Sequence, residues 1–417
     1  MFRVLQRDGI NGLLRVIRRR LVRFLGGGIW AGYRDEAMTL SKLYDYSERD
    51  LHLTRKIHET YKGSIDIHRA TWFIPDFYNP YYGGIYTILR FADYLKNVHN
   101  IEQEFALVGS MSEKSISDLI GTAFSSLKYS VVHKLSSVDD FSALSPSDVA
   151  IATLWSTAYS LLRFNQTKRK FYFIQDLESL FYPAGTIQAQ VEATYRFGFY
   201  GLANTPTLQR IYEHDFNGKA EFFFPCVDTK IFYPGNAQFT PHSPYRLFFY
   251  GRPDHPRNGF EMGIEALRKL KKRMGDEVEI LTAGANWEPA DYSLKGIVKN
   301  LGVLNLKETA ELYRICDAGF VLMFTRHPSY IPFELMASGS LVITNWNPFT
   351  TWFLKDEVNC LLAFPGVTCI SEKLEYGLRD SKLREKIVAT ALKQISESFS
   401  DWSSEFEKLY QFMRAPK

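Results

Sequence analysis

The most chemically informative stretch is 325–345, where a helix is expected to begin directly after a buried strand. Pro332 suits the first turn of that helix, because the N–H that proline lacks has no partner there in any helix. The N–H groups of Tyr330, Ile331 and Phe333 would point outward from the helix start. We expect this turn to bind an anion such as a diphosphate.

Glu334 lies one turn into the same expected helix, which should end before Gly339. A carboxylate cannot bind phosphate, but it can accept hydrogen bonds from the ribose hydroxyls beside the phosphates. Alternatively, Glu334 only favours the positive end of the helix dipole. The residues leave both interpretations open.

Two arginines, Arg252 and Arg257, flank a second loop between a strand and a helix, in the segment 249–259. Each carries a fixed positive charge with a fork of N–H donors, so the pair could clamp phosphate oxygens. The alternative is that they are ordinary surface arginines.

A pair of acids, Asp176 and Glu178, follows the expected strand 171–174. At the carboxyl end of a strand they could act in acid or base catalysis or hold sugar hydroxyls. They could equally cap the next segment. Gly83 and Gly84 follow an earlier strand, and they either let a ligand approach the backbone or form only a tight turn.

The elements that must position these residues alternate between strand and helix, which predicts mainly parallel sheets in an α/β protein. Expected strands are 70–74, 105–108, 149–152, 171–174, 201–203, 246–250, 278–283, 318–324 and 341–344. Two Rossmann-like halves follow, over residues 66–240 and 241–395. A helical segment (1–65) precedes them, and a final helix (396–417) is expected to pack back on the first half through Trp402, Phe406, Leu409 and Tyr410.

Composition narrows the possible partners. The 417 residues are 46% hydrophobic and 23% charged, as in globular domains, and the net charge of +4 is too small to indicate nucleic acid. The four cysteines are far apart, which favours a reducing compartment over a disulfide framework. Neither a membrane-spanning run nor a secretory signal is recognisable, so we expect a cytoplasmic protein.

Positive charge concentrates in residues 1–25, where seven arginines oppose one aspartate, a net of +6. Apolar residues recur between them at helical spacing. A basic amphipathic helix of this kind could lie on an anionic membrane surface. The alternative is a helix that packs its apolar stripe on its own protein.

Taken together, these motifs resemble the family 4 glycosyltransferases of GT-B architecture, in which two Rossmann-like domains face each other across a cleft. The resemblance covers about residues 68–415 and is carried by Pro225–Pro234, Gly251–Gly259 and Pro332–Gly339. The details Phe-Ile-Gln-Asp (173–176) and His-Pro-Ser-Tyr-Ile-Pro-Phe-Glu (327–334) are most similar to rhamnan-synthesis rhamnosyltransferases.

The resemblance implies a nucleotide-sugar donor, dTDP-β-L-rhamnose, bound mainly by the second half, and a glycan acceptor that is rhamnose-containing and could be lipid-linked. Arg252 matches the family's phosphate-binding arginine, and Asn258 stands where the family has a lysine, one place after Arg257. Glu334 matches the second glutamate of a paired motif and is implied to hold ribose, whereas His327 lies near the place of the first. The remaining implied donor-binding residues are Ser329, Tyr330, Ile331, Val303 and Leu304, the last two beside the base.

The family transfers sugars with retention of configuration, and no covalent nucleophile is identifiable in this sequence. We therefore expect catalysis by stabilisation of the leaving diphosphate through Arg252, Arg257 and the helix start, with Asp176 as a further catalytic candidate and no metal or other cofactor. Two alternatives stay open: a catalytically silent glycan-binding protein of this fold, and a nucleotide-sugar epimerase.

Overall fold

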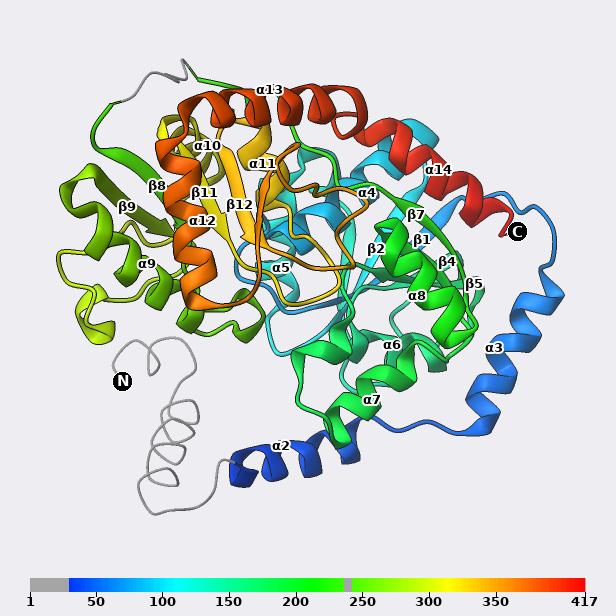
Figure 1. Ribbon diagram of the computed structural model, residues 1–417. Helices are drawn as coiled ribbons and strands as arrows, with labels where there is room; N and C mark the ends of the chain where they lie inside the picture. Colours follow the sequence, from blue (N-terminus) through cyan, green and yellow to red (C-terminus); the bar gives the residue numbers. More distant parts are fainter. Residues whose placement is uncertain (1–29, 236–241, 417) are drawn as a thin grey trace.

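The computed structural model describes residues 30–235 and 242–416, which form two α/β domains (Figure 1). The predicted basic helix in residues 1–28 lies outside the described residues. Each domain has a parallel sheet with apolar clusters on both of its faces, so its strands are buried almost throughout. In β4, for example, all six residues are buried.

The first domain contains a seven-stranded sheet in the order β3-β2-β1-β4-β5-β6-β7. Its strands are β1 (Arg69–Pro75), β2 (Glu102–Val108), β3 (Val131–Lys134), β4 (Ser147–Ala152), β5 (Thr167–Ile174), β6 (Tyr200–Asn204) and β7 (Lys219–Phe223). Its helices are α4 (Gly83–His99), α5 (Glu113–Ala123), α6 (Trp155–Arg163), α7 (Thr186–Thr194) and α8 (Pro206–Phe216), with a 3-10 turn η2 (Glu178–Phe181). The sequence prediction missed β3 and β7.

The second domain contains a six-stranded sheet in the order β10-β9-β8-β11-β12-β13. Its strands are β8 (Tyr245–Tyr250), β9 (Val278–Ala283), β10 (Lys299–Asn300), β11 (Ala318–Val321), β12 (Leu341–Asn345) and β13 (Leu361–Ala363). Its helices are α9 (Phe260–Met274), α10 (Leu306–Ile315), α11 (Ile331–Ala337), α12 (Val367–Arg379) and α13 (Ser381–Ser398), with a 3-10 turn η3 (Pro256–Asn258). In the sequence, Asn305 and Glu308 have the three-residue spacing that predicts a capping box, and at the start of α10 they exchange backbone and side-chain hydrogen bonds as expected.

One expected strand is shorter than predicted, because β11 ends at Val321 rather than at residue 324. The Asn345 side chain accepts a hydrogen bond from the Met323 N–H (2.8 Å) and donates one to the Met323 carbonyl (3.0 Å). At Met323 the Asn345 side chain thus makes the hydrogen bonds that the backbone of β12 would otherwise make, and the chain leaves the sheet after Val321.

Helices from both ends of the described chain pack on the first domain. Figure 1 shows α13 running along the top of the molecule and α14 (Trp402–Arg414) continuing over the first domain. Phe406 and Leu409 belong to that domain's core, and Trp402 and Tyr410 pack against it, which confirms the expected packing. The amino-terminal helices are α2 (Trp30–Leu43) and α3 (Glu48–Thr60).

Arg169, a buried cation on β5, connects the ends of α3 and α14 through hydrogen bonds. The Arg169 side chain is 1% exposed, and its guanidinium donates to the carbonyls of Tyr61 (2.9 Å) and Gly63 just after α3. It also donates to the carbonyls of Met413 (2.8 Å) and Arg414 at the end of α14. Four carbonyl oxygens therefore accept hydrogen bonds from this buried charge.

The chain crosses between the domains twice, and the two crossings are bonded to each other. The first follows β7, and the second lies between α13 and α14. The Val227 N–H donates to the Phe399 carbonyl (2.8 Å), and the Phe224 N–H donates to the Glu405 carboxylate (2.7 Å). The Phe224 and Phe399 rings meet edge to face, with centroids 5.3 Å apart.

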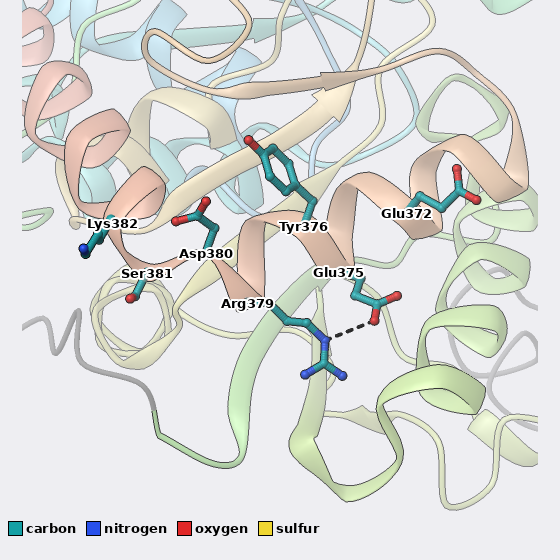
Figure 2. Close-up of a pocket in the computed structure, with 7 residues that line it drawn as sticks. All are labelled: Glu372, Glu375, Tyr376, Arg379, Asp380, Ser381 and Lys382. Carbon is teal, nitrogen blue, oxygen red and sulfur yellow. Dashed lines mark hydrogen bonds and ion pairs between the residues drawn. The ribbon is translucent and has the colours of Figure 1, made fainter.

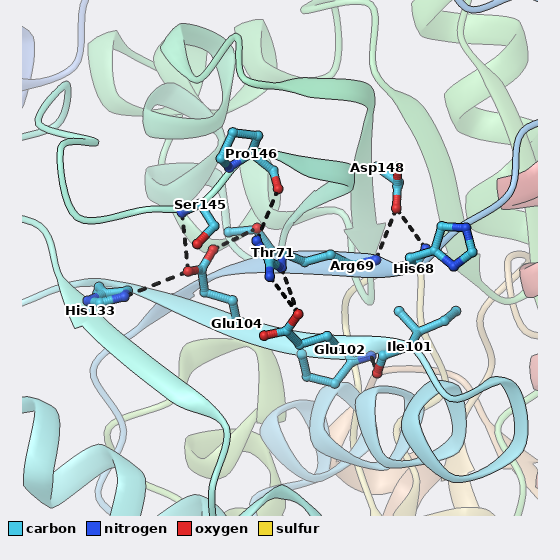
Figure 3. Close-up of polar contacts among 11 residues, drawn as sticks. His68, Arg69, Thr71, Ile101, Glu102, Glu104, His133, Ser145, Pro146 and Asp148 are labelled. Atoms are coloured by element: carbon cyan, nitrogen blue, oxygen red, sulfur yellow. Dashed lines mark hydrogen bonds and ion pairs between the residues drawn. The ribbon is translucent and has the colours of Figure 1, made fainter.

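Polar contacts tie the strands of the first sheet together near their amino-terminal ends (Figure 3). Glu104 accepts hydrogen bonds from the Thr71 hydroxyl (3.1 Å) and the Ser145 N–H (3.3 Å). Asp148 accepts from two backbone N–H groups and pairs with Lys168 at 2.6 Å. This edge of the sheet is thus held together by groups that find their partners within the first domain.

Candidate active site between the two domains

The carboxyl ends of the two sheets meet, and several polar contacts cross from one domain to the other. The Thr325 hydroxyl donates to Asp176 (2.9 Å), and the Thr207 hydroxyl donates to the Phe349 carbonyl (2.8 Å). In open α/β sheets ligands bind outside the carboxyl ends of the strands, so this boundary is the natural place for a site.

Tyr330, the residue before α11, inserts its side chain into the first domain. Its hydroxyl accepts a hydrogen bond from the Asn204 amide at the end of β6 (2.6 Å) and lies 2.8 Å from the Thr87 hydroxyl of α4. A Cβ atom on Gly83 would lie 3.1 Å from the Tyr330 ring. The start of α11 is therefore anchored directly to the first domain.

Asp176 follows β5 and faces the second domain. Besides Thr325, the Leu177 N–H (2.8 Å) and the Arg326 N–H donate to its carboxylate. Burial raises the pKa of Asp176 to about 6, although the Arg257 charge and these hydrogen bonds oppose the rise. The carboxylate can therefore change its charge near neutral pH, which suits acid or base catalysis.

Glu178, the second acid of the pair, has a structural partner instead. It is 5% exposed and accepts a hydrogen bond from the Trp155 N–H at the start of α6 (2.7 Å). The Tyr172 hydroxyl donates to the same carboxylate oxygen (3.2 Å). Burial raises the pKa of Glu178 to about 8. Glu178 thus caps α6, an earlier helix, rather than the segment that follows it, whereas Asp176 lies at the domain boundary.

Arg252 lies in the loop after β8. Its guanidinium donates to the Tyr250 hydroxyl (3.0 Å) and to Nε2 of His255 (2.6 Å), while its Nε is buried without a partner among the described residues. Burial, together with the charges of Arg252 and Arg257, lowers the pKa of His255 to about 4, so this ring is neutral. A neutral histidine leaves the arginine's positive charge uncompensated, as binding of an anion requires.

Arg257, in the same loop, reaches the domain boundary. Its guanidinium stacks over the Phe181 ring of the first domain, 4.4 Å from the centroid, and its carbonyl accepts from the Phe324 N–H (2.9 Å). The neighbouring Asn258 is 2% exposed, and its side-chain oxygen has no partner in the described chain. Arg257 is thus held close to the segment that leads into α11, and Arg252 lies five residues earlier in the same loop.

The start of α11 has the expected form, with Pro332 in its first turn and a left-handed Gly339 (φ 81°) just after its end. No acceptor lies opposite the N–H groups of Tyr330, Ile331 and Phe333 within the described ranges. Ser329 just before the helix has φ 69°, a left-handed conformation that turns this backbone. Burial raises the pKa of the helix's Glu334 to about 7.

His327 lies in the loop between β11 and α11, and its side chain is 5% exposed. The Ser329 N–H donates to its Nδ1 (2.9 Å), and the ring lies 5.8 Å from the Tyr330 ring. Burial, and secondarily the Arg257 charge, lowers the pKa of His327 to about 3, so the ring is neutral. Its Nε2 is buried without a partner in the described residues.

The apolar pattern of the sequence predicts a helix start near Ile85, with Gly83 and Gly84 in the loop before it. This prediction was wrong, since both glycines form the first turn of α4. A turn without side chains fits here against Tyr330 and Gln175, whose amide donates to the Gly84 carbonyl (2.9 Å). The exposed backbone of both glycines still lies at the carboxyl end of β1.

Val303 and Leu304 follow β10 at the same end of the second sheet. The Gly284 N–H after β9 donates to the Gly302 carbonyl (2.9 Å), which holds this segment in place. Val303 is 47% exposed and Leu304 is partly buried, so Val303 is open to a ligand such as a base.

Sequence reasoning missed several residues that shape the boundary: Thr87, Phe181, Asn204, Thr325 and Arg326. Asn204 could have been found, because it ends a strand and polar residues at that position face the ligand edge of a parallel sheet. The others are identified only by contacts between segments far apart in the chain.

A surface hollow lies elsewhere, outside the domain boundary. Figure 2 shows it on the outer face of α12 and the start of α13, where Arg379 pairs with Glu375 (3.1 Å). Arg379 also pairs with Glu277, which directly precedes β9 (2.8 Å). The hollow is therefore at the amino-terminal edge of the second sheet, away from the domain boundary.

A protein-held metal ion would need several ligating side chains close together. Within residues 30–235 and 242–416, no group of three or more His, Cys, Asp or Glu side chains is arranged to hold a metal ion. In the same ranges, no helix is both long and apolar enough to cross a bilayer.

Known structures share this two-domain arrangement. Sucrose-phosphate synthase from Thermosynechococcus elongatus superposes with a TM-score of 0.63 at 12% identity, over 83% of this chain and 98% of that one. Anabaena HepE in complex with UDP-glucose gives 0.62 at 14% identity, over 82% and 99%. At such low identity the likeness concerns the fold, which is GT-B, as predicted from the sequence.

Sequence comparisons identify the relatives more closely. A family model described as "WsaF, C-terminal domain" matches residues 245–375. The O-antigen biosynthesis protein RfbC of Myxococcus xanthus is 39% identical over 353 residues, which make up 84% of this chain and 27% of RfbC. The chain thus spans about a quarter of that relative's length. The expected resemblance is confirmed: residues 245–375 are similar to the WsaF C-terminal domain, and the fold is GT-B.

Proposed function

We propose that the protein is a retaining glycosyltransferase that moves L-rhamnose from dTDP-β-L-rhamnose to a rhamnose-containing glycan acceptor. One observation carries the proposal: the loop with Arg252 and Arg257, and the free N–H groups before α11, follow the neighbouring strands β8 and β11 at the carboxyl edge of the second sheet. Fixed cations and aligned N–H groups are what a sugar diphosphate needs. RfbC, by its name, serves O-antigen biosynthesis, and HepE is known with UDP-glucose.

The proposed mechanism is stabilisation of the leaving group. As the bond between sugar and phosphate breaks, negative charge grows on the diphosphate, and both arginines are already in position to meet it. Neutral His255 and His327 add no competing charge. Glu334, one turn into α11, accepts the ribose hydroxyls in this proposal, and Val303 with Leu304 lies beside the base.

The acceptor is proposed to approach from the first domain. Asp176 lies at the boundary between the domains and can gain or lose a proton near neutral pH. It is therefore the candidate to accept a proton from the acceptor hydroxyl or to orient that hydroxyl. The exposed backbone of Gly83 and Gly84 lies on the same side.

A direct test is transfer of radiolabelled rhamnose from dTDP-rhamnose to a rhamnosyl acceptor, with UDP- and GDP-sugars as competing donors. We expect labelled glycan and dTDP as products. A silent glycan-binding protein would form neither, and an epimerase would alter the nucleotide sugar without an acceptor. Preference for a UDP- or GDP-sugar would overturn the choice of donor while leaving the transferase class intact.

We also propose a cytoplasmic location, with the basic segment at residues 1–25 on the inner face of the membrane. The full-length chain should sediment with anionic liposomes. A variant with Arg18, Arg19 and Arg20 changed to glutamine should bind them less, because each arginine near the surface contributes about 1 kcal/mol. Equal sedimentation of both proteins would contradict this location.

A further inference from the structure

The loop between β11 and α11 presents a buried hydrogen-bond donor that nothing in the described chain accepts. Nδ1 of His327 accepts the Ser329 N–H (2.9 Å), so in the neutral ring the proton resides on Nε2. Nε2 is buried and has no partner in residues 30–235 or 242–416. The side chain is 5% exposed, so its donor is largely withdrawn from solvent.

The surroundings keep this ring neutral. The nearby charged groups are the Arg257 guanidinium, which disfavours a second positive charge, and Asp176, which is bonded to Thr325 two residues before the histidine. The Tyr330 ring, 5.8 Å away, contributes no charge. A neutral imidazole in this position can donate a hydrogen bond but cannot act as a proton carrier at physiological pH.

We propose that His327 is a donor-binding residue, whose Nε2–H donates a hydrogen bond to an oxygen of the bound sugar diphosphate. The loop that carries His327 begins at Phe324, whose N–H donates to the Arg257 carbonyl, and ends at the N–H groups before α11. The inference rests on the proposed function, because it assigns a further contact within the same site. The acceptor is an oxygen of the transferred sugar or of the adjoining phosphate.

A purely structural role makes the opposite prediction. If His327 only holds the loop, its important atom is Nδ1, which accepts the Ser329 N–H. Two substitutions separate the atoms: the amide oxygen of His327→Asn can take the place of Nδ1, and the amide nitrogen of His327→Gln can take the place of Nε2. Each variant keeps one of the two hydrogen bonds and loses the other.

The experiment is titration calorimetry of the full-length wild type and both variants with dTDP and with dTDP-L-rhamnose, alongside thermal unfolding. We expect His327→Asn to unfold like the wild type but to bind dTDP-rhamnose about tenfold more weakly. His327→Gln should bind within about threefold of the wild type despite a lower unfolding temperature. Weaker binding of dTDP as well indicates a phosphate oxygen, and unchanged dTDP binding indicates the sugar.

Wild-type affinity for His327→Asn, or weaker binding by His327→Gln than by His327→Asn, would overturn the inference. Equal weakening in both variants would also overturn it, since loss of loop structure alone predicts that result. In all these cases the proposed function stands, because the wild type still binds the nucleotide sugar. A wild type that binds neither dTDP nor dTDP-rhamnose overturns both.

Discussion

The amino-terminal edge of the first sheet and the carboxyl-terminal edges that meet at the domain boundary use polar groups in opposite ways. At the first, Glu104, Asp148 and Arg69 are paired within their own domain, while the hydroxyls of Ser130 and Ser147 are buried without a partner among the residues that the structure describes. At the second, many buried polar atoms lack partners within the described residues: those of Gln175, Asn204, Arg252, His255, Asn258, Thr282 and His327.

This difference separates stability from function. A buried polar atom without a partner costs roughly 1–3 kcal/mol, so a cluster of them needs an explanation. Paired groups at the amino-terminal edge stabilise the sheet. Unpaired groups at the carboxyl-terminal edge lie where parallel sheets bind ligands, and they are suited to hydrogen-bond a polar molecule.

The largest expected effect is at Arg252. Replacing it with alanine should lower kcat by about 100-fold to 1,000-fold, because a fixed donor to the leaving diphosphate is lost. The measurement is rhamnose transfer at saturating donor. Arg69→Ala is the matched control at the paired edge, where the guanidinium bonds Glu102 on the surface, and it should transfer at the wild-type rate. Full turnover by Arg252→Ala would contradict the functional role proposed for the carboxyl-terminal edges.

The pH dependence of transfer should follow Asp176, whose pKa is raised to about 6. If its carboxylate must be ionised, kcat should fall by about tenfold for each pH unit below pH 6. The Asp176→Asn variant should be slow at every pH, and its pH profile should lack this fall. The effect on stability has the opposite sign. Because the folded pKa lies above the unfolded one, the neutral acid favours folding, and that contribution is lost as pH rises through about 6.

Both measurements for Asp176 can contradict this interpretation. A low-pH limb that survives unchanged in Asp176→Asn belongs to another group. Urea unfolding at pH 5 and pH 8 provides the second check, since Asp176→Asn should lose less stability than the wild type between these values.

At the paired edge, Glu104→Ala should change stability and leave the chemistry alone. It removes the acceptor of the Thr71 hydroxyl and the Ser145 N–H, which should cost about 1–3 kcal/mol of unfolding free energy. Urea denaturation measures this cost, and kcat per folded molecule should stay at the wild-type value. A large fall in kcat with unchanged stability would show that the two edges are not functionally distinct.

The smallest expected effect is that of chelation. If stationary arginines and backbone N–H groups alone bind the diphosphate, EDTA should leave the rate of transfer unchanged. The assay compares untreated, EDTA-treated and magnesium-supplemented enzyme. Loss of activity on chelation that magnesium restores would mean that a cation shares the role proposed for Arg252 and Arg257.

Sequence patterns predicted most of the framework because they record local physics. The start of α11 at Ile331–Pro332 and the Asn305–Glu308 capping box depend on residues a few positions apart. Short elements were harder. β3 has four residues, of which one is fully buried, and β7 ends in two phenylalanines that continue directly into Phe224 of the interdomain crossing. β10 and β13, with two and three residues, were also missed.

The site was predicted in part, for a related reason. Polar residues just after strands, such as Asp176 and Arg252, follow from the rule that ligands bind at carboxyl edges. Their partners do not, since Thr325 lies 149 residues from Asp176 and Asn204 lies 126 residues from Tyr330. Such pairs depend on how two domains dock, which no local pattern encodes. The two acids have different roles, because Asp176 faces the second domain whereas Glu178 faces the start of α6.

The paired crossings at Val227 and Phe399 limit how the domains can move. With both connections side by side and hydrogen-bonded, they act as a single pivot rather than as two separate tethers. Rotation about that pivot preserves its bonds, whereas translation of one lobe away from the other would break them. Opening for substrate entry should therefore be an angular motion, largest at the rim farthest from the pivot.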